Sequence, residues 1–476
     1  ARFCGLRGQN MSGSEFDSRD RLRMASNFRT ILNDLKRRPE DAARELGVAR
    51  EQIDRCLSGD IAIPMELVEK AVAVWPVSPR DFFLLEDDCP TGVKIMRSAA
   101  SEASARVMAR GGIDYYEYRD TAMSSAAAFR PEWIQELCVV EDDDPENPKV
   151  QWNNGHFLHQ FTYFVGPVNF YYRDADGSKR VVRMNTGDSM YISPFVPHTF
   201  TTRQNAQGEV GLILALTYAN RLGGETQQEL GLLGRDEAEH LVMQFDSPQV
   251  ASGSLVKFHR ETLSMPLEQL AENLGEPPQT LRAIENGELD IDIELLTEIA
   301  QELKVAPREL LAGGAGEATT RIRKHDECRI WAIPHDAQVP FYRFVELCGA
   351  EKLPFSRALE VAVSGSSRED PVWLQVGLHQ YAYNLGNSTL TILWYLADQL
   401  LEESVEPGDS FYMKPGTRHA FLGEQGKLLI LRIAGRLGGD VLQELAAIGP
   451  KHLDRVLAES KQWFDANGRQ DLASVS

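Results

Sequence analysis

The sequence lacks any long apolar run: nowhere in its 476 residues does a stretch approach the ~18–20 consecutive apolar residues that a membrane-spanning helix needs. No signal-peptide pattern opens the chain. Its six cysteines are scattered without the CxxC spacing of a zinc knuckle or a redox pair, which is typical of reduced thiols. We therefore expect a cytoplasmic protein that does not enter a membrane.

Basic residues are also scarce. The chain has 50 Lys and Arg residues against 70 Asp and Glu residues, which gives a formal net charge of −20. Nucleic acids are bound mainly by cationic side chains that neutralise phosphates, so this balance argues against a nucleic-acid-binding protein. The hydrophobic share of 43% is typical of a globular protein, and the length requires more than one hydrophobic core.

A helical pattern occurs twice in the chain. Residues 46–85 and residues 274–311 align at a constant offset of 228 positions, which pairs Leu46 with Leu274, Gly59 with Gly287 and Pro79 with Pro307. Each copy predicts a helix that ends at a Leu-Gly turn, a short second helix that Gly stops, and an amphipathic third helix. This is the layout of a helix-turn-helix motif within a small lobe of five helices.

A second repeated pattern follows each helical lobe. The segment "GHFLHQFTYFVGPVNFYY" (155–172) resembles "VGLHQYAYNLGNSTLTIL" (376–393), and "TGDSMYISPFVPHTF" (186–200) resembles "PGDSFYMKPGTRHAF" (407–421). These segments alternate apolar and polar residues and carry Gly-Asp turns, which predicts antiparallel strands. Early histidines followed by G-D-x and P-x-x-H are typical of a cupin, or jelly-roll, barrel.

The predicted fold is therefore α+β, a tandem repeat of an all-α helix-turn-helix-like lobe followed by a cupin barrel. The expected divisions are an N-terminal extension (1–20), a first lobe (21–95), a catalytic barrel (96–240), a second lobe (241–315) and a second barrel (316–476).

The first barrel offers side chains for a metal. Non-haem iron favours two histidines and one further ligand on one face, with open positions beside them. The candidates are His156, His159 or Gln160, and His198. Positions i and i+4 of a strand share a face, so His156 and Gln160 should point the same way and His159 the opposite way. We therefore predict Fe(II) bound by His156, Gln160 and His198, with His159 packed or hydrogen-bonded elsewhere.

The second barrel keeps only part of this set. Gln380 and His419 correspond to Gln160 and His198, but Val376 stands where His156 stands in the first copy. One imidazole cannot hold iron well, so we predict that this barrel is degenerate. In the first barrel, a neutral glutamine ligand leaves the metal one unit more positive than a carboxylate would, which favours an anionic ligand.

At these residues the chain resembles the phosphonate-processing non-haem iron oxygenases. Epoxidases of that family carry His, then Glu four residues later, then a distant His, and this spacing holds His156, Gln160 and His198 here. The dioxygenases take a carboxylate from a position six residues before the last His, which is Ile192 here. The methylphosphonate-forming members combine His, Gln and Ile at these places, as this chain does.

The resemblance also assigns residues to the substrate. The family asparagine of "NNGH" falls on Asn153, and the stretch "RGGIDYYEY" places phosphonate contacts on Arg110 and Tyr118. "LNDLK" resembles the segment whose lysine reaches an active site, which places a catalytic or substrate-binding role on Lys36. A family serine contact near position 215 is replaced by Ala215, with Thr217 close by.

The activity that the resemblance implies is the O2-dependent conversion of 2-hydroxyethylphosphonate to methylphosphonate and CO2 by carbon–carbon cleavage. The alternative is a dioxygenase that gives hydroxymethylphosphonate and formate, and a cupin isomerase or an oxygenase for a related phosphonate remains open. Our hypothesis is that Ile192 and the neutral Gln160 decide between the two cleavage outcomes. If Lys36 acts across subunits, the protein would be a homo-oligomer.

The rival reading is a helix-turn-helix transcriptional regulator with a cupin sensor. Residues 264–311 carry three basic residues against eleven acidic ones, and residues 25–76 carry eight against nine. Such lobes would be repelled by DNA or at best be neutral toward it. We therefore predict that both lobes are scaffolding, with small phosphonates and O2 as the partners of the protein.

Overall fold

The computed structural model describes residues 18–83, 85–127, 129–218, 222–311, 320–351 and 353–457. The chain divides into two compact units, one of residues 1–87 with 439–476 and one of residues 88–438. None of the helices within the described ranges is both long and apolar enough to cross a membrane.

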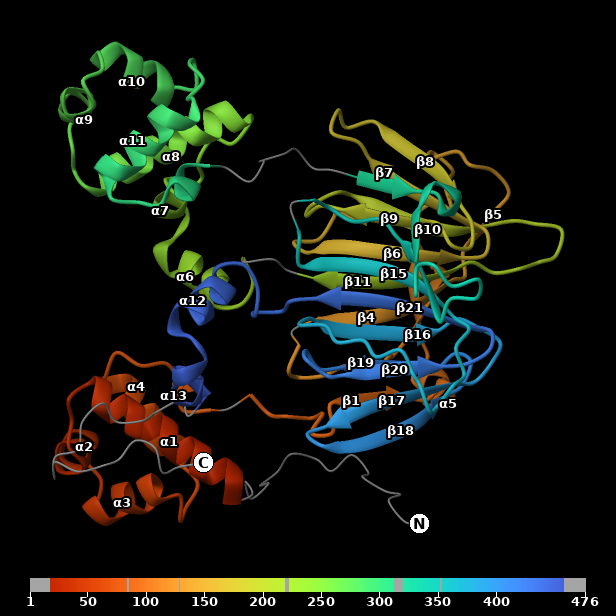
Figure 1. Ribbon diagram of the computed structural model, residues 1–476, viewed down its shortest axis with the longest axis horizontal. Coiled ribbons are helices and arrows are strands. Elements are labelled where there is room, and N and C mark those ends of the chain that lie inside the picture. Colours follow the sequence, from red (N-terminus) through yellow and green to blue (C-terminus); the bar gives the residue numbers. More distant parts are fainter. Residues whose placement is uncertain are drawn as a thin grey trace. The chain divides into compact units, whose positions relative to one another are not determined.

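The first unit is helical, as Figure 1 shows. Its helices are α1 (Ser18–Asp34), α2 (Pro39–Leu46), α3 (Arg50–Ser58), α4 (Met65–Val74), the 3₁₀ turn η1 (Pro79–Asp81), α12 (Asp440–Ile448), η4 (Pro450–His452) and α13 (Leu453–Leu457). Helices α2 and α3 end at Gly47 and Gly59, whose positive φ angles of 63° and 77° suit a left-handed cap. The predicted helix-turn-helix pattern is confirmed here, although the fifth helix of the lobe is a 3₁₀ turn.

The second helical lobe repeats this arrangement inside the larger unit. It contains α8 (Pro248–Thr262), α9 (Leu267–Leu274), α10 (Pro278–Glu285), α11 (Ile293–Leu303) and η2 (Pro307–Leu310), and it follows α6 (Glu225–Leu233) and α7 (Arg235–Glu239). Arg260 on α8 donates two hydrogen bonds, of 2.6 and 2.8 Å, to the buried carboxylate of Glu285 on α10. The ion pair between Arg260 and the buried Glu285 therefore holds α8 and α10 together.

Two pairs of β-sheets make up most of the larger unit. The first double sheet joins a seven-stranded sheet, in the order β12-β9-β6-β11-β4-β3-β2, with a four-stranded sheet, in the order β5-β10-β7-β8. Its strands are β2 (Arg106–Arg110), β3 (Ile113–Arg119), β4 (Arg130–Glu136), β5 (Val139–Val140), β6 (His159–Val165), β7 (Val168–Arg173), β8 (Lys179–Met184), β9 (Ser189–Ile192), β10 (His198–Arg203), β11 (Leu212–Tyr218) and β12 (Thr320–Arg323).

The second double sheet has the same plan. Its seven-stranded sheet runs β1-β19-β16-β21-β15-β14-β13 and its three-stranded sheet runs β18-β17-β20. Its strands are β1 (Val93–Met96), β13 (Arg329–Ile333), β14 (Tyr342–Glu346), β15 (Ser356–Val363), β16 (His379–Asn384), β17 (Leu390–Leu396), β18 (Gln399–Val405), β19 (Ser410–Met413), β20 (His419–Leu422) and β21 (Gly426–Ile433). A short helix follows each of the two edge strands: α5 (Ser98–Ala103) follows β1, and η3 (His325–Glu327) follows β12.

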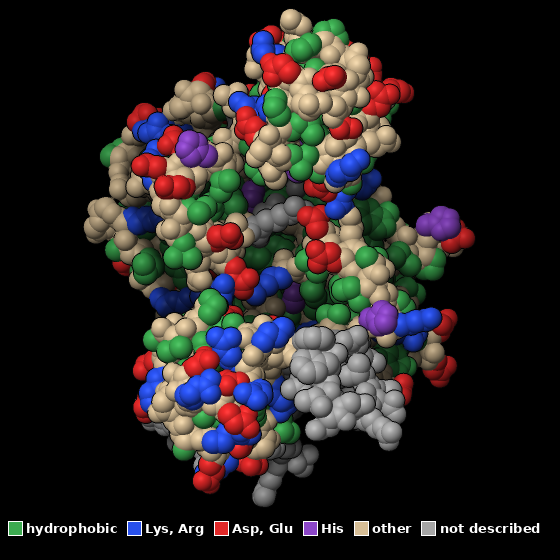
Figure 2. All heavy atoms as spheres, turned by 90° about the vertical axis from the view of Figure 1, so that its left-hand side faces the viewer, with side chains coloured by type: hydrophobic (Ala, Val, Ile, Leu, Met, Phe, Trp, Pro, Cys, Tyr) green, Lys and Arg blue, Asp and Glu red, His purple; other side chains and the backbone are tan. Residues whose placement is uncertain are grey.

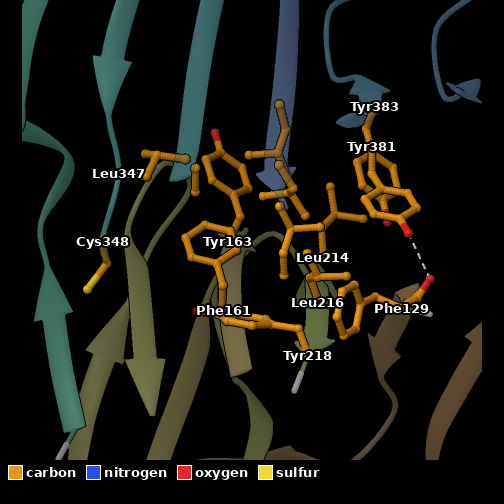
Figure 3. Packing of buried hydrophobic residues seen from close by; sticks show 14 of the residues in the cluster. Phe129, Phe161, Tyr163, Leu214, Leu216, Tyr218, Leu347, Cys348, Tyr381 and Tyr383 are labelled. Carbon is orange, nitrogen blue, oxygen red and sulfur yellow. Dashed lines mark hydrogen bonds between the residues drawn. The ribbon is translucent and has the colours of Figure 1, made fainter. Parts of the chain in front are cut away.

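Each double sheet encloses its own apolar core, and a third core joins the two. Phe164, Phe170 and Met190 belong to the core of the first double sheet, and Phe411 and Ile430 to that of the second. The joining core, drawn in Figure 3, is formed by the opposite faces of the large sheets. Because alternate residues of a strand face opposite sides, each central strand serves two cores at once.

Polar contacts cross this joining core as well. Tyr163 of β6 donates a hydrogen bond of 2.7 Å to the carboxylate of Glu360 on β15. Tyr381 of β16 donates one of 2.9 Å to the carbonyl of Phe129, marked by a dashed line in Figure 3. The two double sheets are therefore held in a fixed register by specific contacts in addition to apolar packing.

The two double sheets also exchange edge strands. Strand β1, which precedes the first double sheet in the chain, pairs with β19 of the second, and β12, which follows the second lobe, pairs with β9 of the first. An aspartate of a Gly-Asp turn fastens each exchanged strand. Neither exchange is part of the domain division expected from the sequence.

The two aspartates make matching contacts. Asp188 accepts from the Lys324 ammonium at 2.7 Å and from the His325 amide at 3.1 Å. Asp409 accepts from Arg97 at 2.8 Å and from the Ser98 amide at 2.7 Å. Both carboxylates are almost fully buried, so each is stabilised by a cation and by a backbone donor.

Candidate metal centre

The predicted ligands meet at one end of the first double sheet. Gln160 lies near the start of β6 and His198 begins β10, and both are buried. The Nε2 atom of His156 lies 2.9 Å from Oε1 of Gln160, and the ring centroids of His156 and His198 are 5.2 Å apart. The structure therefore brings the three side chains together.

His156 does not lie on the same strand as Gln160, contrary to the prediction from alternation. Strand β6 begins at His159, so His156 lies in the loop before it. Gly155 turns this loop with a φ of 76°, and a Cβ atom there would lie 2.5 Å from the backbone of Phe195. The Phe195 amide then donates to the carbonyl of His156 at 2.8 Å. The close approach of two loops, which only glycine allows, turns the histidine toward the site.

Both histidines are oriented by backbone carbonyls. Nδ1 of His156 lies 2.7 Å from the Leu158 carbonyl, and Nδ1 of His198 lies 2.8 Å from the Val196 carbonyl. Because a carbonyl can only accept, each Nδ1 carries a proton, which leaves Nε2 as the ring atom available to a metal. Burial lowers the pKa of His198 to about 4, which keeps this ring neutral at physiological pH.

Gln160 is oriented as an oxygen ligand. Its Nε2 donates a hydrogen bond of 2.8 Å to the hydroxyl of Thr162, which turns Oε1 toward His156. With His156 Nε2 unprotonated, two lone-pair atoms face each other at 2.9 Å, an arrangement that a shared cation would stabilise. Two ligands bound to one metal at about 2.1 Å and near a right angle are about 3 Å apart. These donors therefore fit a metal ion.

A carboxylate does not complete this site. Among the described residues, no group of three His, Cys, Asp or Glu side chains is close enough to hold a metal ion. A metal bound here by three side chains would therefore need the neutral amide of Gln160 as its third ligand. Neutral amide oxygen is a weaker donor than carboxylate, so the site keeps the full charge of the metal.

His159 lies on the other face of β6. Its Nδ1 is 2.7 Å from the Tyr191 hydroxyl, and its ring stacks between Tyr191 and Tyr218 with centroid distances of 5.9 and 5.8 Å. Burial lowers its pKa. This histidine packs toward the joining core and points away from the three metal-ligand candidates.

Ile192 is the direct neighbour of Gln160. The two residues pair across β9 and β6, and Ile192 is 1% exposed. On the other side of β6, Thr217 of β11 pairs with Gln160. Ala215 of β11 pairs with Thr162, two residues further along β6. The amide of Gln160 is thus flanked by an apolar side chain and a hydroxyl-bearing one.

Arg110 and Tyr118 lie on the adjoining strands β2 and β3. The guanidinium carbon of Arg110 lies 4.6 Å from the ring centroid of Tyr116, and its Nη1 is buried with no hydrogen-bond acceptor among the described residues. Burial raises the pKa of Tyr118 to about 12, against the opposing effect of Arg110. Arg110 is therefore a partly buried cation whose Nη1 N–H group can donate to an anionic partner.

Asn153 contacts His198 with both ends of its amide. Its Oδ1 accepts from the amides of Gly155 and His198, each at 2.9 Å, so the orientation of the group is fixed. Its Nδ2 then faces Nε2 of His198 at 3.3 Å. The structure places Asn153 as a partner of the predicted ligand, with one N–H group directed at the site.

The chain shares its sequence and fold with known phosphonate enzymes. A family model for helix-turn-helix domains matches residues 256–310. Methylphosphonate synthase of Nitrosopumilus maritimus is 48% identical over 447 residues, covering 94% of this chain and 96% of that protein. The chain belongs to the methylphosphonate synthase family.

One solved structure and one further sequence relative are also similar to this chain. Streptomyces albus HEPD, solved with 2-hydroxyethylphosphonate and Fe(II) bound, superposes with a TM-score of 0.87 at 37% identity, covering 94% of this chain and 100% of that one. An (S)-2-hydroxypropylphosphonic acid epoxidase of Streptomyces wedmorensis is 29% identical over 93 residues, 19% of this chain and 44% of that protein. The mixed helix and sheet fold is thus that of HEPD.

Two glutamates of the first double sheet, one partly buried and one fully buried, were not predicted from the sequence. Glu132 and Glu136 lie on β4 with Ile134, whose side chain is in the core of the first double sheet. Burial raises the pKa of both carboxyl groups, and neither oxygen of Glu136 has a hydrogen-bond donor among the described residues. The alternation in "PEWIQE" could have revealed two carboxyl groups on an apolar strand face.

Lys36 belongs to the other compact unit. It follows α1 with a φ of 57°, and its ammonium donates to the Asn33 carbonyl at 3.0 Å. Its assignment to the active site of a methylphosphonate synthase family member therefore stays a prediction.

Proposed function

We propose that the protein converts 2-hydroxyethylphosphonate and O2 to methylphosphonate, CO2 and water at one Fe(II) ion held by His156, Gln160 and His198. The observation that carries the reaction is the 48% identity with methylphosphonate synthase over 94% of the chain. The stated substrates and products balance in atoms and electrons, so no separate reductant is needed. This agrees with the absence of a recognisable nucleotide or flavin motif in the sequence.

Fe(II) held by these three residues would supply positive charge toward the anionic substrate and redox chemistry toward O2. The residues of the chain supply the rest. Carbonyl contacts hold the two imidazoles in the ligand tautomer, and Thr162 holds the amide oxygen inward. With neutral ligands, the site is well matched to an anionic substrate.

In the proposed complex, Arg110 and Asn153 bind the phosphonate group. The buried Nη1 of Arg110 is an N–H donor with no acceptor among the described residues, and a phosphonate oxygen would satisfy it. Occupation of His198 Nε2 by a metal would release the facing N–H of Asn153 for the same anion. Tyr118 and Lys36 are proposed as further contacts with the substrate.

We propose further that both double sheets are cupin barrels and that the second is degenerate. The shared strand order of the large sheets, with the predicted ligands at the start of β6 and β10, supports this reading. The protein is expected to act as a soluble enzyme, and a homo-oligomer is required if Lys36 acts across subunits.

The dioxygenase reaction, which gives hydroxymethylphosphonate and formate, is the second candidate because HEPD has so similar a fold. The apolar side chain of Ile192 next to Gln160 favours the methylphosphonate outcome under our hypothesis. Replacing Ile192 with Gln is expected to change the ratio of the two phosphonate products while turnover persists. An unchanged ratio would contradict a role of this residue in the outcome.

A DNA-binding role is disfavoured by how the arginines of the first lobe are used. Arg38 and Arg44 both pair with Asp41, and Arg50 pairs with Glu40 and Asp54. Figure 2 shows acidic and basic side chains interspersed over the face that it presents. Cations engaged by carboxylates in this way have little to offer a phosphate backbone.

Phosphorus NMR after Fe(II)-loaded protein meets 2-hydroxyethylphosphonate and O2 tests the proposal. A methylphosphonate signal is the expected result. Hydroxymethylphosphonate would instead indicate the dioxygenase reaction, and unchanged substrate with bound iron would overturn both reactions.

A further inference from the structure

The second double sheet keeps the backbone contacts that position the ligand candidates His156 and His198 in the first. The Gly416 amide donates to the Val376 carbonyl at 2.7 Å, as the Phe195 amide donates to that of His156 at 2.8 Å. His419 Nδ1 lies 2.8 Å from the Thr417 carbonyl, the same contact that orients His198. Val376 and His419 therefore occupy the places of two of the three ligand candidates in space as well as in sequence.

The strand next to the glutamine differs between the two copies. Gln160 pairs with Thr217 across β6 and β11, whereas Gln380 pairs with Arg432 across β16 and β21. Arg432 Nε donates a hydrogen bond of 2.9 Å to Oε1 of Gln380. The arginine thus engages the atom that corresponds to the proposed oxygen ligand of the first double sheet.

Arg432 has no anionic partner among the described residues. No ion pair joins it to a carboxylate, and burial lowers its pKa to about 10, so it remains cationic at neutral pH. The Nε2 of the buried His419 has no hydrogen-bond partner within the described part of the chain either. A positive centre, a glutamine oxygen and an unused imidazole nitrogen are thus retained without a metal.

We propose that the guanidinium of Arg432 replaces the metal ion in the second double sheet, and that this sheet is a latent divalent-metal site closed by Val376 and Arg432 alone. The proposal rests on the ligand set proposed for the first double sheet. It implies that substitution of these two residues by their counterparts, His and Thr, completes a second set of His, Gln and His ligands.

The test is the number of Co(II) ions bound per full-length chain, measured by calorimetric titration and by metal analysis after desalting. Four proteins are compared: the wild type, His156→Ala, Val376→His/Arg432→Thr, and the variant with all three substitutions. The expected stoichiometries are one, zero, two and one. In the triple variant, Co(II) should also raise the melting temperature, since it binds the folded state only.

Two outcomes separate this inference from the proposed function. Zero Co(II) in the wild type would overturn the ligand set of the first double sheet. One Co(II) in the wild type, but still one in a folded Val376→His/Arg432→Thr variant, would overturn the latent site while leaving the first site intact.

The single variant Val376→His tests the role of the arginine even if the double variant fails to fold. It supplies the missing imidazole while Arg432 still engages Gln380, so it is expected to bind one Co(II) ion, as the wild type does. A second bound Co(II) in this variant would show that the guanidinium does not exclude the metal. Arg432→Lys combined with Val376→His keeps a cation and is likewise expected to bind one.

Discussion

The two double sheets have one backbone plan and two different centres. Both present a glutamine early on a central strand, a histidine at the start of a facing strand and a buried Gly-Asp turn that fastens an exchanged strand. They differ where the first has His156 and the second Val376, and at the strand neighbour of the glutamine, which is Thr217 in the first and Arg432 in the second. Under the proposed ligand set, a few side chains at one end of the sheets, and not the strand framework, decide whether this fold is suited to a metal.

The loops at the metal end carry a further difference. Phe195 has a φ of 65°, a conformation that side-chain-bearing residues rarely adopt, whereas its counterpart in the second double sheet is Gly416 at 79°. Phe195 is also 64% exposed and lies 6.1 Å from the ring of Phe157. Strain of this kind is retained where surrounding contacts impose it, often beside a functional site.

The largest effect should come from removing equivalent histidines from the two centres. His198→Ala is expected to lower Fe(II) affinity and turnover by more than ~100-fold, because a metal ligand is lost outright. His419→Ala should leave both unchanged. Metal analysis and phosphorus NMR measure the two effects, and a similar loss in both variants would abolish the distinction between the centres.

The Gly-Asp turns should behave alike, since they serve the fold and not the chemistry. Asp188→Asn and Asp409→Asn each weaken charge-assisted contacts to an exchanged strand, with an expected loss of about 2–3 kcal/mol in the free energy of unfolding. Urea denaturation of the metal-free proteins measures it. A large loss in one variant and none in the other would mean that only one exchange contributes to stability.

The hydroxyl of Thr162 should matter in the first double sheet alone. Thr162→Val removes the acceptor that turns the Gln160 oxygen inward, so Fe(II) affinity is expected to fall about tenfold. The corresponding residue of the second sheet is Ala382, which offers no hydroxyl; Thr391→Val there serves as the matched control. Titration calorimetry measures the Fe(II) affinity of the two variants. Equal affinities would show that the Thr162 hydroxyl does not contribute to metal binding.

The smallest effect concerns pH. Burial lowers the pKa of His419 to about 4, against about 6.5 in an unfolded chain. Because the unfolded state binds the proton more readily, this residue gives its full stability above pH ~6.5, and that stability is lost as the pH falls toward 4. In metal-free protein at pH 6, protonation of this residue in the unfolded chain should lower the free energy of unfolding by about 1 kcal/mol. Replacing His419 with Gln should remove this loss.

Melting curves between pH 7.5 and 5 provide the measurement, with the exposed His335→Gln variant as control. A pH dependence identical in the wild type and in His419→Gln would mean that this imidazole titrates normally in the folded protein.

Local sequence was sufficient to predict most elements. The Leu-Gly turns predict the ends of α2 and α9, and alternation predicts β6, β7, β16 and β17, because capping and strand periodicity depend on neighbouring residues. The same alternation failed for His156, since strand β6 starts later than the pattern suggests. The loop contact between Gly155 and Phe195 then restores the predicted meeting with Gln160.

The sequence by itself determined the duplication, the helix-turn-helix and strand patterns, and which copy carries two histidines and a glutamine. Only the tertiary structure decided that β1 and β12 change places between the sheets, that Arg432 engages Gln380, and that Glu136 is buried beside Tyr116, over whose ring Arg110 lies. The physical reason is separation along the chain. Contacts between residues 20 to 320 positions apart depend on how whole sheets pair, and no local pattern records that pairing.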